Sequence, residues 1–274
     1  MTVAELLAAA RRTLHPRPGM LFPQREARAF LAALFGESEA HVLAHPEREV
    51  PEPLAARFFA FCQRRQAGEP FHLILGRCPF YGREFLVAPG VLVPRPETEL
   101  LVEAALRLPL PPRPRVLDVG TGSGVLAVTL ALELPQARLA ASDVDWQALA
   151  LARQNARRHG AAVRFALGSL AAPWGGLWEL VVANLPYLPE DYQAPPELAW
   201  ENPRALFAGH DGLALLRPFV AQLPRLLAPS GFAVLEVGEG QAEKLAAEAP
   251  ASLVPHDVVF DARRVARVLV LRRR

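Results

Sequence analysis

Four consecutive residues, Asn184-Leu185-Pro186-Tyr187, carry the groups needed to hold a planar NH2 group. Asn184 offers a side-chain carbonyl as a hydrogen-bond acceptor. Pro186 favours an extended conformation for Leu185, whose backbone carbonyl can then point outward, and Tyr187 offers a flat face for stacking. Two acceptors that take both N–H hydrogens aim the nitrogen lone pair at an electrophile, so these four residues, hereafter the tetrapeptide, are catalytic candidates. A proline turn that only ends a strand is the alternative interpretation.

A glycine-rich segment, Asp118-Val119-Gly120-Thr121-Gly122-Ser123-Gly124, follows an apolar strand pattern and opens a helical one. Glycines let the backbone pass close to a ligand, and the N–H groups at a helix start point toward it. Val125 stands where the dinucleotide fingerprint requires glycine, which disfavours an NAD site, and the phosphate-loop pattern of ATPases is missing from the sequence. The cofactor-binding candidates of this segment are Gly120, Thr121, Gly122, Ser123 and Gly124.

An acidic residue, Asp143, ends the next strand pattern about 20 residues beyond the glycines. A carboxylate there can accept hydrogen bonds from both ribose hydroxyls of an adenosine, a group shared by nucleotide cofactors and S-adenosylmethionine. Asp145 is a second candidate, although capping the helix that begins at Trp146 would explain it as well.

Strand and helix patterns alternate after residue 114, which predicts an α/β fold with a mainly parallel sheet. The carboxyl ends of parallel strands meet at one edge, so the glycine-rich segment, Asp143 and the tetrapeptide should share one crevice. No helix separates the last two strands, which predicts an antiparallel hairpin at one edge of a seven-stranded sheet. The predicted strands are 115–119, 138–142, 163–166, 179–183, 232–237, 258–260 and 265–271, and the predicted helices are 123–134, 146–159, 212–227 and 241–249.

Residues 2–76 show helical periodicity instead, with helices expected over 3–14, from 23 onward and over 53–67. A hairpin turning at Gly82-Arg83 should follow, and then a helix over 97–107 that Pro96 begins. The predicted organisation is therefore a small helical bundle (1–76), a β-hairpin linker (77–93) and an α/β domain (94–274).

Composition narrows the class of protein further. The chain has 274 residues, 51% of them hydrophobic, and a net charge of +2, which does not indicate a general nucleic-acid binder. Its two cysteines form no disulfide framework, and no metal-ligand spacing occurs in the sequence. No apolar run approaches the ~20 residues that span a bilayer. We expect a soluble, cytoplasmic protein without a metal.

These motifs resemble the HemK/PrmC family, the release-factor glutamine methyltransferases. The segment Pro94-Arg95-Pro96-Glu97-Thr98-Glu99 is more specific than the glycine-rich segment or the tetrapeptide. The resemblance covers nearly the whole chain and also includes Gly76, Phe80-Tyr81-Gly82, Phe85, residues 89–93, Glu201-Asn202-Pro203-Arg204-Ala205-Leu206, Gly209, Asp211-Gly212-Leu213, Leu235-Glu236-Val237-Gly238 and Gln241.

The resemblance implies a class I (Rossmann-like) methyltransferase domain preceded by a helical domain that recognises the substrate. It implies S-adenosylmethionine as the cofactor and, as the partner, peptide-chain release factors, methylated on the glutamine of their Gly-Gly-Gln loop. By position, residues 120–124 would line the methionine part of the cofactor and Asp143 would bind its ribose. Ser169 and Leu170 would lie on the adenine side, and Thr98 would help to cap the cofactor pocket. Asn184, which also borders the cofactor, and the Leu185 backbone would bind the substrate amide.

Two residues depart from the family pattern. Leu185 stands where the family usually has proline, and Ser169 where it usually has aspartate. Leucine at 185 is tolerable if that residue acts only through its backbone carbonyl. Serine at 169 is a weaker hydrogen-bond acceptor toward adenine than the usual aspartate. The alternatives are methylation of a ribosomal-protein glutamine, methylation of an exocyclic adenine or guanine amino group in a nucleic acid, and a non-catalytic cofactor-binding adaptor. Asn184 and Tyr187 argue against the adaptor.

Overall fold

The computed structural model describes residues 1–20 and 22–274, which form two compact units. The helical unit comprises Met1–Arg77 together with Gln193–Trp200, and the larger unit comprises Cys78–Tyr192 together with Glu201–Arg274. This division differs from the linear one predicted above in two respects. The hairpin belongs with the larger unit, and Gln193–Trp200, which follow the tetrapeptide in sequence, belong with the helical unit.

Short-range signals set the ends of the helices in the helical unit. Thr2 and Glu5 form a reciprocal capping box at the first helix, and Gly36 ends the second in the left-handed conformation. Two helices were not predicted, because six and five residues are too few to display a helical period. The helices are α1 (Val3–Thr13), α2 (Pro23–Phe35), α3 (Glu39–Ala44), α4 (Glu52–Gln66) and α5 (Phe71–Leu75).

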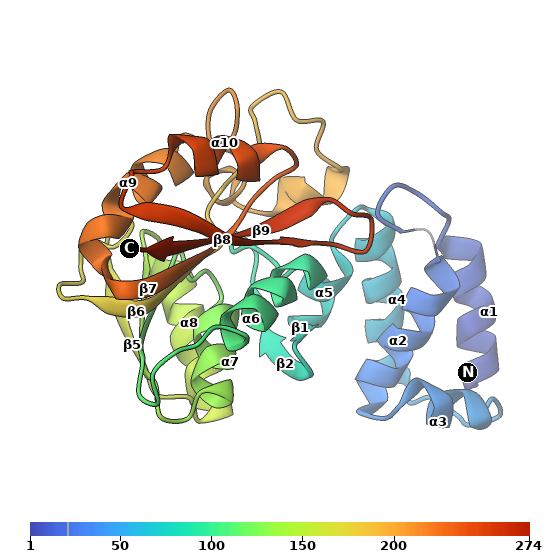
Figure 1. Cartoon of the computed structure of the whole chain (residues 1–274). Coiled ribbons are helices and arrows are strands. Elements are labelled where there is room, and N and C mark those ends of the chain that lie inside the picture. The colour runs from blue at the N-terminus through green and yellow to red at the C-terminus, as the bar shows by residue number, and fades with distance from the viewer. Residues whose placement is uncertain (21) are drawn as a thin grey trace. The chain divides into compact units, whose positions relative to one another are not determined.

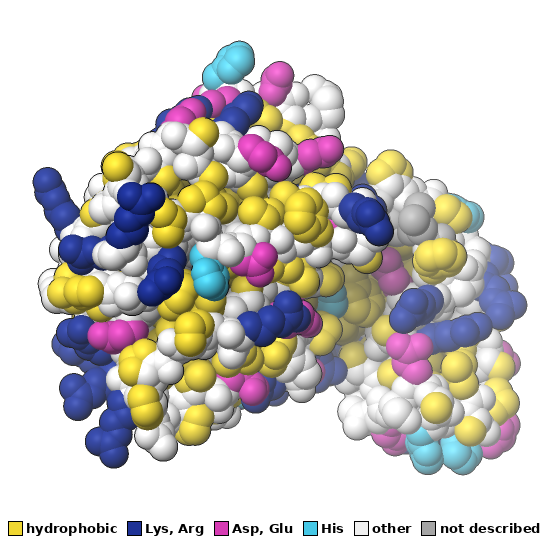
Figure 2. Space-filling view, in the orientation of Figure 1, with side chains coloured by type: hydrophobic (Ala, Val, Ile, Leu, Met, Phe, Trp, Pro, Cys, Tyr) yellow, Lys and Arg dark blue, Asp and Glu magenta, His cyan; other side chains and the backbone are white. Residues whose placement is uncertain are grey.

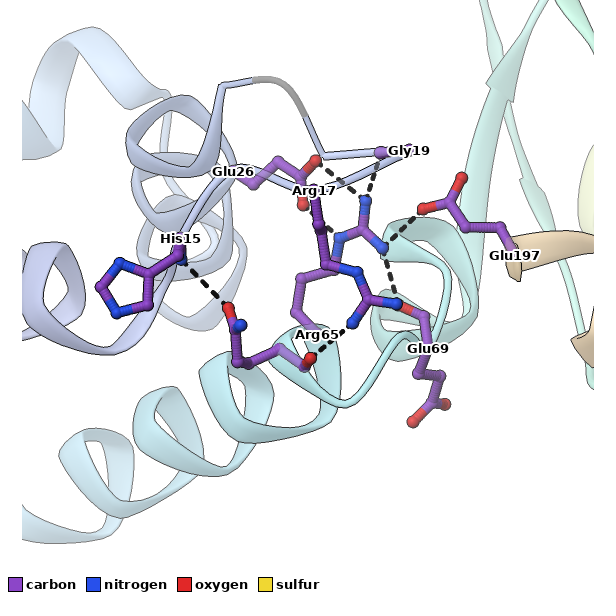
Figure 3. A network of polar contacts seen from close by, with 8 residues as sticks. His15, Arg17, Gly19, Glu26, Arg65, Glu69 and Glu197 are labelled. Carbon is purple, nitrogen blue, oxygen red and sulfur yellow. Dashed lines mark hydrogen bonds and ion pairs between the residues drawn. The ribbon is translucent and has the colours of Figure 1, made fainter. Parts of the chain in front are cut away.

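A buried arginine, Arg65 of α4, joins four segments of the helical unit (Figure 3). Its guanidinium forms ion pairs with Glu26 of α2 and with Glu197, the latter at 2.6 Å. It also donates to the backbone carbonyls of Gly19, at 2.6 Å, and Glu69, at 3.1 Å. Only 1% of Arg65 is exposed, so its charge depends on these partners for stabilisation. The network ties residues 193–200 to the helices across a long separation in sequence.

Replacement of Arg65 by alanine should therefore lower the free energy of unfolding of the helical unit by about 3 kcal/mol. The change leaves two carboxylates and two backbone carbonyls without their shared donor. The matched control is Arg64→Ala on the same helix, whose side chain is 43% exposed in its ion pair with Glu69 and should contribute about 1 kcal/mol or less. Urea unfolding followed by far-UV circular dichroism measures both, and equal effects would contradict the role given to Arg65.

The larger unit contains a seven-stranded sheet in the order β5-β4-β3-β6-β7-β9-β8 (Figure 1). All neighbours from β5 to β7 are parallel, and β9 is antiparallel to both β7 and β8. The predicted sheet and its antiparallel edge hairpin are thus confirmed. The strands are β3 (Arg115–Val119), β4 (Arg138–Asp143), β5 (Val163–Leu167), β6 (Trp178–Ala183), β7 (Leu227–Glu236), β8 (Leu253–Phe260) and β9 (Ala266–Arg273); β1 (Arg77–Phe80) and β2 (Arg83–Leu86) form the separate hairpin.

Helices cover both faces of this sheet, and side chains alternate between the two cores. On β6, Leu180 and Val182 face the core with α6, α7 and α8, whereas Val181 and Ala183 face the core with α9 and α10. Figure 1 shows α9 and α10 on one side of the sheet and α6 to α8 on the other. The helices are α6 (Glu99–Leu106), α7 (Val125–Glu133), α8 (Trp146–His159), α9 (Leu216–Leu226) and α10 (Gln241–Glu248), with 3-10 turns at Pro96–Thr98, Pro196–Trp200 and Pro203–Ala205.

Three elements begin well away from their predicted positions: β7 and β8 begin earlier, at Leu227 and Leu253 instead of 232 and 258, and α9 begins later than predicted. Helical pattern begins at residue 212 in the sequence, but the helix begins at Leu216, and Gly212 itself adopts a left-handed conformation at φ +73° that does not belong to a right-handed helix. Among the helices of the described residues, none is long and apolar enough to cross a membrane.

Candidate functional site

A cavity of about 520 Å³ opens at the carboxyl ends of β3, β4 and β6, where the strand order reverses. A site at this switch point is what an open parallel sheet favours, and the volume suits a ligand of nucleoside size. A cavity of about 30 Å³ adjoins it and shares Gly120, Gly122 and Asn184 with it. Of the predicted site residues, the larger cavity is lined by Gly120, Gly122, Asp143, Ser169, Leu170, Asn184, Leu185 and Pro186, and the smaller also by Thr98, Thr121 and Ser123.

The glycine turn (residues 120–124, between β3 and α7) is stabilised by Asp118, which is fully buried. Its Oδ2 accepts hydrogen bonds from the Thr121 hydroxyl at 2.6 Å and from the Ala127 backbone N–H at 3.2 Å. Burial raises the pKa of Asp118 to about 7, against the lowering effect of these two donors. Asp118 therefore shapes the turn between β3 and α7, and it does not line either cavity described above.

Two glycines of the turn are required by close packing. A Cβ on Gly120 would lie 2.8 Å from the Leu185 side chain, and one on Gly124 would lie 2.9 Å from the Ala152 Cβ. Gly120 thus lets the turn approach the tetrapeptide, whereas Gly124 lets α7 approach α8. Gly124 lies outside the lining of both cavities, so contact between its backbone and a cofactor stays a prediction.

Asp143 lines the larger cavity at the end of β4. Its two carboxylate oxygens each accept one backbone N–H, from Gly122 at 2.8 Å and from Asp145 at 2.9 Å. Burial raises the pKa of Asp143 above its ordinary value. Each oxygen keeps acceptor capacity for a ribose hydroxyl. Asp145 accepts from the Gln147 backbone N–H at 2.8 Å, which confirms it as the N-cap of α8.

The part of the cavity wall that we expect to face adenine is formed by residues that follow β5. Ser169 and Leu170 both line the cavity, and Leu170 has φ +49°, in the left-handed region. Its carbonyl accepts a hydrogen bond from the Ser142 hydroxyl at 2.7 Å, which stabilises this conformation. The contact of either residue with a cofactor stays a prediction.

Asn184 is the polar side chain of the tetrapeptide that borders both cavities. Its Nδ2 donates to the Thr98 hydroxyl at 3.1 Å. Among the residues that the structure describes, no donor is recorded for its Oδ1. Leu185 and Pro186 follow along the wall of the larger cavity. The arrangement can therefore offer an amide oxygen to an NH2 group placed in this cavity.

Tyr187 fixes the position of the tetrapeptide through two hydrogen bonds. Its hydroxyl donates to Glu236 Oε1 at 3.0 Å, and its backbone carbonyl accepts from Gln241 Nε2 at 2.9 Å. Burial raises the pKa of the Tyr187 hydroxyl well above its ordinary value. The ring does not line either cavity described above, so stacking of a planar group on it stays a prediction.

Three supporting residues were not predicted as parts of the site. Glu236 accepts a hydrogen bond from the Tyr187 hydroxyl, Gln241 donates one to the Tyr187 backbone carbonyl, and Asn155 connects the hairpin to the glycine turn. Asn155 is fully buried, and its amide bonds both backbone groups of Leu86, at 2.8 and 3.0 Å, and the Ser123 carbonyl at 2.8 Å. A polar residue within an apolar run, as in Leu235-Glu236-Val237, is the signal that could have found Glu236.

Comparison with known proteins finds similarity over most of the chain. A model of the PrmC N-terminal domain matches residues 5–76, and a model of the methyltransferase small domain matches residues 96–201. A release factor glutamine methyltransferase of Deinococcus radiodurans is 39% identical over 251 residues, which cover 90% of this chain and 90% of that protein. One of Neisseria gonorrhoeae is 42% identical over 224 residues, covering 80% of this chain and 82% of that protein.

Among solved structures, a methyltransferase from Pyrococcus furiosus aligns with a TM-score of 0.55 at 16% identity, covering 79% of this chain and 96% of that one. At this identity the similarity is one of fold, and it agrees with the sheet described above.

Proposed function

Because this chain belongs to the family of release factor glutamine methyltransferases, we propose that it methylates the side-chain amide nitrogen of the Gly-Gly-Gln glutamine in peptide-chain release factors. S-adenosylmethionine is the methyl donor. One observation carries the proposal: Asn184 borders the cavity with its amide nitrogen bonded to Thr98 and its Oδ1 available to a substrate NH2 group.

The cavity suits this cofactor in volume and in polar groups. Gly120 has a left-handed φ of +74°, and a Cβ there would lie 2.8 Å from the Leu185 side chain, while Asp143 lines the cavity with both carboxylate oxygens bound to backbone N–H groups. We infer that residues 120–124 hold the methionine part, Asp143 the ribose hydroxyls, and Ser169 with Leu170 the adenine. When bound, the cofactor supplies an electrophilic methyl group on a sulfonium sulfur.

The chain's own residues then act on the substrate amide. An amide nitrogen is a poor nucleophile because its lone pair is delocalised into the carbonyl. Hydrogen bonds from its two N–H groups to Asn184 Oδ1 and to the Leu185 carbonyl fix its plane and direct the lone pair. These bonds strengthen as the nitrogen gains positive charge, so they stabilise the transition state more than the bound substrate.

The helical unit has its own hydrophobic core, built on residues such as Phe30 and Phe58. We propose that it recognises the body of the release factor, because a bundle that folds around a core of its own is not needed to complete the sheet. We also infer a cytoplasmic location, since the proposed substrate acts on ribosomes.

Methylation of a nucleic-acid base is the weaker alternative. Such an enzyme must extrude its base and bind phosphates through a basic groove. Lys and Arg number 30 against 28 Asp and Glu, so the net charge does not favour a nucleic-acid substrate, although Figure 2 shows many basic side chains along the left margin of the visible face.

Transfer of a labelled methyl group tests the proposal directly. The protein is incubated with labelled S-adenosylmethionine and, separately, with a release factor, ribosomal proteins, DNA and RNA. We expect label on the release factor and none on the same factor with its Gly-Gly-Gln glutamine changed to alanine. Label found only on ribosomal proteins, or only on nucleic acid, would show that the substrate is one of these and not a release factor.

A further inference from the structure

The cavities are lined by two segments that come from different parts of the sequence. One is the glycine turn, through Gly120 and Gly122 in both cavities. The other is the segment that follows the β1–β2 hairpin, residues 87–94, hereafter the post-hairpin segment, with Leu92 in both cavities. A ligand that touches both segments binds more tightly when their separation is fixed beforehand, because less order has to be created on binding. An element that joins the two segments should therefore influence the affinity for the ligand.

One face of α8 packs against both of these segments. Its members are spaced by three and four positions along the helix, and they are Ala148, Leu151, Ala152 and Asn155. Ala148 and Leu151 form a small apolar cluster with Val91 of the post-hairpin segment. Ala152 lies beside the glycine turn, since a Cβ on Gly124 would be 2.9 Å from the Ala152 Cβ. The same face of α8 therefore supports both segments.

Asn155 joins the two segments through hydrogen bonds of its side chain. Its Oδ1 accepts from the Leu86 backbone N–H at 2.8 Å, and its Nδ2 donates to the Leu86 carbonyl at 3.0 Å. The same Nδ2 donates to the Ser123 carbonyl, in the glycine turn, at 2.8 Å. Leu86 ends β2 directly before the post-hairpin segment, so one amide fixes the start of that segment together with the turn. Asn155 is fully buried, where a backbone group left without its partner is costly.

The three bonds require the chemistry of a primary amide. An amide oxygen accepts hydrogen bonds, and an amide NH2 donates two. Aspartate has the same shape but no donor when it is ionised, and leucine has neither donor nor acceptor. A position that only filled space between α8 and the hairpin would accept an apolar side chain. The residue type at 155 is thus matched to the three backbone groups that it joins.

We propose that Asn155 is a positioning residue for S-adenosylmethionine, which holds the post-hairpin segment and the glycine turn at the separation that the cofactor requires. The inference rests on the cofactor contacts proposed above for the glycine turn. Asn155 lines neither of the cavities described, so it acts through the backbone of Leu86 and Ser123. Its loss should weaken cofactor binding, while the methyl-transfer step at Asn184 should be unaffected when the cofactor is saturating.

Two variants of the full chain remove the bonds of Asn155. Asn155→Asp keeps the shape and the acceptor but loses both donors, and Asn155→Leu loses all three bonds. The matched control is His159→Phe, one helical turn farther along α8. His159 Nε2 is hydrogen-bonded to the Glu84 carbonyl of β2 at 2.9 Å, and among the described residues it has no recorded bond to the glycine turn. Phenylalanine keeps a ring against Phe85, so this variant weakens only the contact between α8 and the hairpin.

A second control separates cofactor binding from general stability. Leu253 is 4% exposed in β8, at the edge of the sheet opposite to β5, and it lines neither of the cavities described. Leu253→Ala should lower the Tm, because it leaves a cavity in the core. Its cofactor Kd should stay close to that of the parent protein, since the site is remote from β8.

Calorimetry with S-adenosylmethionine, well below the unfolding temperature, measures the cofactor Kd. We expect the Kd to rise about tenfold or more in Asn155→Asp and Asn155→Leu, and to change by less than about threefold in the two controls. A Kd within about threefold of the parent value in both Asn155 variants would overturn the proposed role. An equal rise in His159→Phe or in Leu253→Ala would also overturn it, because the hairpin contact alone or the loss of stability would then explain the effect.

Steady-state kinetics give a readout that a merely structural role would not change. In the Asn155 variants the KM for the cofactor should rise with the Kd, while kcat at saturating cofactor stays within about threefold of the parent value. Loss of folded protein would lower kcat and leave the KM for the cofactor unchanged, and that result would refute the positioning role.

Hydrogen exchange in the protein without cofactor follows the two segments directly. Backbone amides of residues 86–94 and of the glycine turn should both exchange faster in Asn155→Leu, whereas in His159→Phe the glycine turn should match the parent protein. Unchanged exchange of the turn in Asn155→Leu would refute the link. A release factor that is not methylated, together with a raised cofactor Kd in the Asn155 variants, would refute the proposed substrate and leave the role of Asn155 standing.

Discussion

Replacement of Asn184 by alanine is expected to lower kcat by about 100-fold or more while cofactor affinity changes little. The variant loses the oxygen that we assign to one N–H of the substrate amide. That bond strengthens as positive charge develops on nitrogen, so its loss should affect the transition state more than substrate binding. Single-turnover methyl transfer gives the chemical step, and calorimetry gives the cofactor Kd.

The comparison variant for this prediction is Asn202→Ala. Asn202 also lines the larger cavity, but its Oδ1 accepts the Arg204 backbone N–H at 3.0 Å. Its side chain is therefore occupied in a turn, and we expect a much smaller effect on kcat. A near-normal single-turnover rate in Asn184→Ala would refute the role given to Asn184.

Gly212→Ala should be the second most damaging change, although residue 212 does not line either cavity described above. A Cβ there would lie 2.0 Å from the Tyr187 carbonyl oxygen and 2.6 Å from Gln241 Nε2. The clash would displace the backbone of the tetrapeptide and break the bond from Gln241. We expect kcat/KM to fall by about 100-fold, since small misplacements of positioned groups have effects of this size.

Gly160→Ala separates this clash from simple backbone strain. Gly160 has φ +66°, similar to the φ +73° of Gly212, but a Cβ there would meet nothing within 4 Å. Each substitution should lower the free energy of unfolding by about 1 kcal/mol, because alanine is less stable than glycine in the left-handed conformation. Only Gly212→Ala should also lose activity. Thermal unfolding and steady-state kinetics on the two proteins decide this, and equal activities would show that the tetrapeptide tolerates the displacement.

Local patterns in the sequence were sufficient to predict most helices and strands of the larger unit. Apolar runs bounded by turn residues located all seven strands of the sheet, and the helix at 146–159 was predicted with its observed bounds. The glycine turn, Asp143 and the tetrapeptide were brought into one crevice by a general property of parallel sheets. The physical reason is that periodicity, caps and glycine conformations depend on neighbours within a few residues.

Only the tertiary structure decided how the tetrapeptide is held. Thr98 lies 86 positions from Asn184 in sequence, and Glu236 lies 49 from Tyr187. The assignment of residues 193–200 to the helical unit, where Glu197 meets Arg65, is equally nonlocal. The position of a buried polar group depends on partners that satisfy it, and those partners can come from anywhere in the chain. The sequence by itself located most of the predicted residues that line the two cavities, and the folded structure determined which hydrogen bonds hold the tetrapeptide.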